Sequence, residues 1–153
     1  MYKRIVVGTD GSVGANVAVD AAIELARQSG ATLHVVYAHK PVSASSMAAA
    51  TQAGVAPNMV EANEGMKEEG DRICAEVVER AEGAGVHTES HCVGGDPAEA
   101  LLRVTEDADA DLLVVGNRGM SGPRRFVLGS VPNKVSHHCP TNLLVVDTSR
   151  ARH

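Results

Sequence analysis

The chain has 153 residues, a formal net charge of −5 at pH 7, 44% hydrophobic residues and 22% charged residues. This length corresponds to about one domain, which can bury enough surface to fold without a metal or a disulfide. The acidic balance and the scarcity of aromatic residues argue against a nucleic-acid groove, because such a groove needs clustered cations and stacking rings. We therefore expect a single domain over 1–153 with no nucleic-acid partner.

The cysteine pattern and the absence of long apolar runs bear on the compartment. The chain has an odd number of cysteines, Cys74, Cys92 and Cys139, and no two of them are spaced as CxxC. Neither a disulfide framework nor a zinc site is therefore predicted. The apolar run after Arg4 is too short for a signal peptide, and no stretch approaches the length that crosses a membrane. These features fit the reducing cytoplasm, with no membrane partner.

Short apolar runs and amphipathic stretches alternate along the chain. In chain order, the pattern predicts a strand at 4–8, a helix at about 14–28, a strand at 33–38, a helix at about 59–82, a strand at 86–93, a helix at about 97–108, a strand at 112–115, a helix at about 130–138 and a strand at 142–146. Gly30 suits a helix C-terminus, and Asp96 with Pro97 suits a helix start. Residues 39–57 show no period, so we expect a flexible loop at about 40–58.

This alternation predicts an α/β fold, because strands that alternate with helices form a mostly parallel sheet with helices on both faces. Ligands of such open sheets bind beyond the carboxyl ends of the strands, where the strand order reverses. The loops that follow the first and fourth predicted strands both lie at that edge. We expect the functional site there.

The loop after the fourth strand carries a glycine-rich pattern, Gly116-x2-Gly119-x9-Gly129-Ser130. Glycines allow close approach of the backbone to a ligand, and the free N–H groups of a helix N-terminus favour a phosphate. A β-carbon at Gly129 is expected to fill the phosphate's space or to strain a φ that only glycine tolerates. The alternative interpretation is a long connection with glycines at its turns, since short glycine patterns recur by accident.

The pattern and its surroundings resemble the universal stress protein family, in its nucleotide-binding branch. The resemblance rests on the glycine pattern, on Val6-Val7-Gly8-Thr9-Asp10-Gly11-Ser12, on Asp111-Leu112-Leu113-Val114-Val115-Gly116 and on Gly129-Ser130-Val131. It implies a five-stranded parallel sheet in the order 3-2-1-4-5, a Rossmann-like or flavodoxin-like open sheet. It also implies a homodimer and a bound adenine nucleotide, ATP or a relative.

The resemblance also implies roles for individual residues. Thr9 and Asp10 would lie by the ribose and adenine, Ala38 would meet the adenine edge through its backbone, and Val115 and Gly116 would pack near the ribose. The phosphates would be held by Arg118, Gly119, Gly129, Ser130 and Val131. Asp10 has a second interpretation as a turn residue.

Two positions depart from the family's usual pattern. Gly8 stands where Pro or Ala is common, a change that we expect to have little effect. Pro132 stands where some members have a hydroxyl residue, which removes one phosphate contact. Relatives with a similar Gly-Ser-Val-Pro run bind cyclic AMP, so cyclic AMP is an alternative ligand to ATP.

The sequence favours a binding module over an enzyme. It has no GxxxxGK(S/T) motif, so the lysine of a P-loop is absent, and no residue stands out as a base placed on a nucleophile. Slow ATP hydrolysis is the alternative; Asp10 and Ser130 are the candidates to contact a Mg²⁺ ion that accompanies ATP. The apolar last strand, Asn142–Val146, would lie at a sheet edge and predicts a dimer through that strand.

Overall fold

A computed structural model describes residues 1–39, 48–49, 51–54, 59–117 and 128–149. Within these residues a five-stranded sheet has the order β3-β2-β1-β4-β5, with every pair parallel. The elements are β1 (Arg4–Gly8), α1 (Val13–Ser29), β2 (Thr32–His39), α3 (Met59–Gly83), β3 (Thr88–Gly94), α4 (Pro97–Asp107), β4 (Leu112–Gly116), α5 (Ser130–His138) and β5 (Asn142–Val146). The predicted α/β fold and strand order are confirmed; the loop expected at about 40–58 lies mostly outside the described residues.

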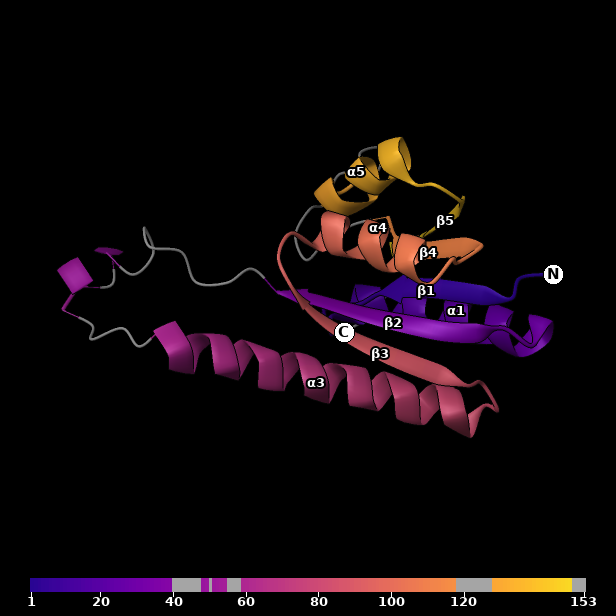
Figure 1. The fold of residues 1–153 in the computed structure, drawn as a ribbon, viewed down its shortest axis with the longest axis horizontal. Helices are drawn as coiled ribbons and strands as arrows, with labels where there is room; N and C mark the ends of the chain where they lie inside the picture. The colour runs from indigo at the N-terminus through magenta and orange to yellow at the C-terminus, as the bar shows by residue number, and fades with distance from the viewer. Residues whose placement is uncertain (40–47, 50, 55–58, 118–127, 150–153) are drawn as a thin grey trace.

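The helices cover both faces of the sheet (Figure 1). Neighbouring residues of a strand point to opposite faces, so one strand can pack against the helices on both sides. On β1, Ile5 and Val7 pack with the apolar stripes of α1 and α3, whereas Val6 packs with those of α4 and α5. All three side chains are fully buried. Burial of such a side chain stabilises the fold by about 1.5–3 kcal/mol, so aliphatic residues can form this core without aromatic ones.

The central position of β1 brings three strand ends together at one edge. β1 pairs with β2 on one side, up to Gly8 opposite Val36, and with β4 on the other. The Thr9 N–H continues this pairing beyond the strand by donating to the Val36 carbonyl at 3.0 Å. The carboxyl ends of β1, β2 and β4 therefore lie side by side.

The helix ends follow the predicted capping residues. The Asp96 carboxylate accepts from the Glu99 N–H at 3.1 Å at the start of α4, and Gly30 ends α1 with a φ of 70°. β3 begins at Thr88 instead of the predicted residue 86, because the Val86 N–H donates to the Ala81 carbonyl at 2.9 Å and closes the turn after α3. No helix among the described residues is both long and apolar enough to cross a membrane.

Candidate functional site

A pocket of about 140 Å³ lies at the carboxyl edge of the sheet, where β1, β2 and β4 end. The start of α1, the first turns of α4 and the start of α5 surround it. It is lined by Gly8, Thr9, Asp10, Ser12, Ala15, Val36, Ala38, Pro97, Leu101, Val115, Gly116, Val131 and Pro132. The residues from which the two predicted loops start, Thr9 after the first strand and Gly116 at the end of the fourth, both line it.

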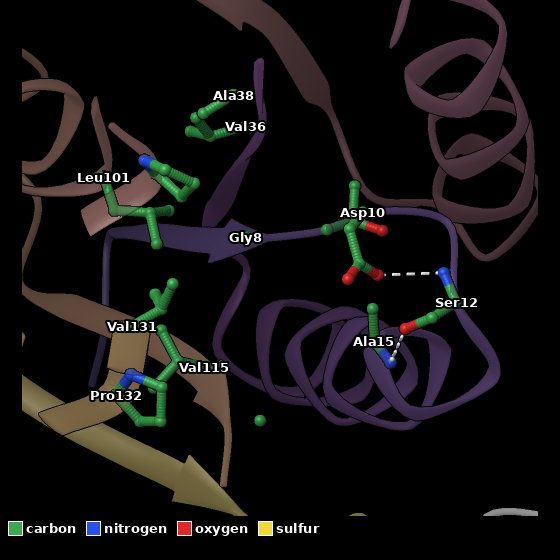
Figure 2. Close-up of a pocket in the computed structure, with 13 residues that line it drawn as sticks. Gly8, Asp10, Ser12, Ala15, Val36, Ala38, Leu101, Val115, Val131 and Pro132 are labelled. Atoms are coloured by element: carbon green, nitrogen blue, oxygen red, sulfur yellow. Dashed lines mark hydrogen bonds between the residues drawn. The ribbon is translucent and has the colours of Figure 1, made fainter. Parts of the chain in front are cut away.

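The pocket has one apolar side and one polar side. Figure 2 shows the apolar side chains of Leu101, Val131 and Pro132 opposite Asp10 and Ser12. A mostly apolar cavity with a few convergent polar groups is typical of small-molecule sites. Such a cavity suits a small molecule that presents an apolar surface on one side and polar groups on the other.

The polar side is held in place by the turn between β1 and α1. The Thr9 hydroxyl accepts from the Gly11 N–H at 3.1 Å, and the Asp10 carboxylate accepts from the Ser12 N–H at 2.9 Å. The Ser12 hydroxyl then accepts from the Ala15 N–H at 3.1 Å and caps α1. Gly11 has a φ of 80°, which favours glycine in this turn. Asp10 is therefore both a turn residue and a residue of the pocket.

The start of α5 supplies donors beside the apolar side. Gly129 is the N-cap, and its own N–H donates to the Asn117 carbonyl at 3.0 Å. The N–H groups of Ser130 and Val131 have no partner within the helix, as is general for a first turn, and Pro132 has no N–H at all. Two backbone N–H groups of this turn can therefore meet an anion.

The backbone at Gly129 corrects one expectation. Its φ is −60° and its ψ is 170°, an extended conformation that any residue adopts. The predicted strain on a side chain at this position is therefore wrong. What a side chain at Gly129 would change is the space and charge at the helix start.

Six of the predicted site residues line the pocket: Thr9, Asp10, Ala38, Val115, Gly116 and Val131. Gly129 and Ser130 directly precede Val131 at the start of α5 and do not line the cavity itself. Arg118 and Gly119 lie outside the described residues. Gly8, noted only as a departure from the family pattern, lines the pocket as well.

Sequence reasoning missed the contribution of α4, which brings Pro97 and Leu101 to the pocket. Pro97 was assigned to the helix start and Leu101 received no role. The helical period places Leu101 on the buried stripe, but it does not say that the stripe ends over the sheet edge. One signal was available in the sequence. α4 begins soon after the carboxyl end of a strand, so its first residues lie near the edge of the sheet where the pocket is.

Asn117 is a second residue that sequence reasoning left without a role. Its carboxamide oxygen accepts from the Thr148 N–H at 3.0 Å and from the Thr148 hydroxyl at 2.8 Å. Its backbone N–H donates to the Val146 carbonyl at 2.9 Å. Asn117 therefore joins the end of β4, the start of α5 and the segment after β5.

Among the described residues that line the pocket, Asp10 is the one with an ionisable side chain. In the part of the chain that the structure describes, no three His, Cys, Asp or Glu side chains are placed to hold a metal ion. His137 and His138 lie in the last turn of α5, a position that favours cationic side chains.

Comparisons with known proteins agree with this fold. The universal stress protein family matches residues 1–147. The chain is 31% identical over 147 residues to universal stress protein YxiE of Bacillus subtilis, covering 95% of this chain and 99% of that protein. It is 35% identical over 153 residues to universal stress protein Rv1636 of Mycobacterium tuberculosis, covering 97% and 98%.

A solved structure described as a universal stress protein in complex with cAMP is also similar to this chain. The two are 34% identical, the alignment covers 97% of this chain and 98% of that one, and the TM-score is 0.69. The whole-length match, the shared sheet order and the pocket at the expected edge support the same conclusion: the chain belongs to the universal stress protein family.

Proposed function

We propose that this chain is an adenine-nucleotide-binding regulatory module of the stress response and that ATP is its preferred ligand. The observation that carries the proposal is the apolar pocket directly beside the first turn of α5. A planar base packs against the side that includes Leu101 and Val131, while a phosphate meets the N–H groups of Ser130 and Val131. The cytoplasm supplies such nucleotides.

Cyclic AMP is a second candidate ligand, and Pro132 is the observation that favours it. Because Pro132 has no N–H, the first turn of α5 offers two backbone donors, which suit one phosphate better than a chain of three. The similar structure with bound cAMP supports the same ligand class. ATP remains the preferred candidate ligand because the sequence between β4 and α5 carries three cationic residues, Arg118, Arg124 and Arg125.

The experiment is calorimetric titration of the purified protein with ATP, ADP, AMP, cyclic AMP and GTP, with and without Mg²⁺. Binding of one or more adenine nucleotides, with GTP bound at least about tenfold more weakly, supports the proposal. A protein freed of copurified nucleotide that binds none of the five contradicts it. The order of the adenine nucleotides decides between ATP and cyclic AMP.

We propose binding as the function, with slow ATP hydrolysis as the alternative. Asp10 and Ser130 are the residues that would contact Mg²⁺ when ATP is bound, and the described lining of the pocket holds no ionisable side chain besides Asp10 that could act as a base. Turnover should therefore stay far below the ~10 per second of a typical enzyme. A fast, Mg²⁺-dependent rate that is lost in Asp10→Ala would replace the binding module by an ATPase.

A homodimer through β5 belongs to the same proposal. β5 is an edge strand, and its four aliphatic residues, 143–146, remain partly exposed in the single chain. An apolar edge of this kind is typically covered in solution. A two-fold arrangement of two β5 strands covers it with one kind of contact.

A further inference from the structure

Gly8 and Leu101 occupy neighbouring space at the floor of the pocket, and both line it. A β-carbon placed on Gly8 would lie 2.9 Å from Leu101 Cδ2 and 3.0 Å from Leu101 Cδ1. Carbon atoms that are not bonded prefer separations of about 3.5–4.0 Å, so this β-carbon and the leucine side chain cannot both keep their places. The branched end of Leu101 fills the volume that any other residue at position 8 would need.

The conflict with a larger residue at this position concerns space and not backbone conformation. Gly8 is the last residue of β1 and is not among the glycines with positive φ. An alanine could therefore adopt the same backbone. The sequence-based expectation that this departure has little effect overlooks Leu101, which lies far away in the sequence.

The packing around Leu101 determines where its side chain would move. Leu101 is 4% exposed and belongs to the apolar cluster that contains Val36, Leu113 and Val115. Interiors packed at this density leave no room for an extra methyl group. The pocket is the open side, so a β-carbon on Gly8 would push the leucine methyl groups into the space of the ligand.

We propose that Gly8 and Leu101 act as a pair that sets the depth of the pocket and thereby the affinity for the nucleotide base. The proposal rests on the nucleotide-binding function proposed above. Gly8 leaves room for Leu101 to lie flat over the end of β1, and Leu101 then forms part of the apolar surface against which the base packs. Affinity depends on the residue at position 8 through Leu101, not through direct contact of that residue with the ligand.

A double-mutant cycle tests the pair. The dissociation constant of the wild type's tightest adenine nucleotide is measured for Gly8→Ala, Leu101→Ala and the double variant, with circular dichroism and thermal melting as controls for folding. We expect Gly8→Ala to weaken binding at least about tenfold, which is about 1.4 kcal/mol. The double variant should match Leu101→Ala within about twofold, because the group displaced by the alanine is gone. Gly83→Ala, where a β-carbon meets nothing within 4 Å, should leave the affinity unchanged.

Three results would overturn the inference. Wild-type affinity in folded Gly8→Ala would show that Leu101 does not enter the ligand space. A loss of about tenfold or more between Leu101→Ala and the double variant would show that position 8 acts on the ligand directly; this comparison also holds if Gly8→Ala alone is too unstable to assay. A wild type that binds no adenine nucleotide removes the proposed function itself, and the inference with it.

Discussion

The Asn117 carboxamide oxygen accepts both the backbone N–H and the hydroxyl of Thr148, at 3.0 and 2.8 Å. Thr148 is buried, and its side chain lies near Gly14 of α1. These two hydrogen bonds fix the segment after β5 to Asn117, the residue that directly follows β4. Two residues 31 positions apart in the sequence connect the site to the chain beyond β5.

We predict that Asn117→Ala destabilises the fold by about 1–3 kcal/mol, because the buried hydroxyl of Thr148 loses its acceptor. Urea unfolding followed by circular dichroism measures this change. Thr148→Val should cost a similar amount, and the double variant should cost less than the sum of the two single changes. Ser149→Ala is the control, since the hydrogen bond of Ser149 within the described residues is donated by its backbone N–H, which alanine keeps. Equal stabilities of Asn117→Ala and the wild type would show that the contact contributes nothing.

A second prediction concerns pH. His34 is 5% exposed; its Nδ1 lies 3.1 Å from His91 Nε2 and 3.3 Å from Glu89 Oε2. Burial lowers the pKa of His34 below its ordinary value; Glu89 counteracts this, and the nearby positive charges of His91, Arg4 and His87 add to it. The buried Nε2 has no hydrogen-bond partner among the described residues, so a proton there would be unsatisfied.

Because the pKa of His34 is lower in the folded chain, the unfolded chain binds more protons as the pH falls below about 6.5. The stability that neutral His34 provides is therefore complete above about pH 6.5 and is lost as the pH falls through its folded pKa. We expect urea unfolding between pH 8 and pH 5 to show this loss in the wild type and a flatter profile in His34→Leu. A His34→Leu profile as steep as that of the wild type would contradict the assignment.

The fold was predictable because its signals are local. The strand at Leu112–Gly116 is a continuous apolar run, and the start of α4 carries both Asp96 and Pro97. Each of these features depends on neighbours within a few residues, so the periods of 2 and 3.6 locate the elements to within one or two positions. The two-residue error at the start of β3 came from a turn, where periodicity carries no information.

The lining of the pocket was predictable where resemblance or turn chemistry marked it, as at Thr9 and Asp10. The place of Leu101 in that lining and the hydrogen bonds of Asn117 were not predictable, because these contacts join segments that are distant in the sequence. The backbone at Gly129 was also wrongly expected, since a glycine in a motif does not reveal whether φ or space requires it. Packing partners and dihedral angles become visible only in three dimensions.

A third prediction concerns assembly. Val145 is the fourth of the five residues of the edge strand β5 and is partly exposed, so a second copy pairing there would bury it. Val145→Lys should convert the dimer to a monomer at micromolar concentration, because an unpaired charge inside an apolar contact is costly. Light scattering measures the mass, and circular dichroism checks the folding, because Val145 also packs against the apolar cluster that contains Leu113 and Val135. A monomeric wild type at the same concentration would contradict the proposed dimer.

A fourth prediction removes a donor from the proposed phosphate position. Ser130 is the first residue of α5, and its side chain is exposed there. Ser130→Ala should weaken nucleotide binding by roughly tenfold to a hundredfold, because a hydrogen bond to a charged group contributes about 1.5–3 kcal/mol. Calorimetric titration measures the loss, and Ser136→Ala at the other end of the helix is the control. Unchanged affinity in Ser130→Ala would remove the hydroxyl from the phosphate contacts.

The last prediction separates two effects of a substitution at Gly129: the effect on the capping of α5 and the effect on the bound phosphate. This residue caps α5 without a side-chain hydrogen bond, and its extended backbone accepts other residues. Gly129→Asn and Gly129→Asp should each stabilise the fold by a few tenths of a kcal/mol, because both side chains are better N-caps than glycine.

The two variants, Gly129→Asn and Gly129→Asp, have nearly the same shape and differ in charge. A phosphate bound at the start of α5 would be repelled by the aspartate alone, so we expect Gly129→Asp to bind at least about tenfold more weakly than Gly129→Asn. Titration at low and high salt adds a check, since the difference should shrink as salt screens the repulsion. Equal affinities in the two variants at low salt would place the phosphate away from α5, whatever their common loss relative to the wild type.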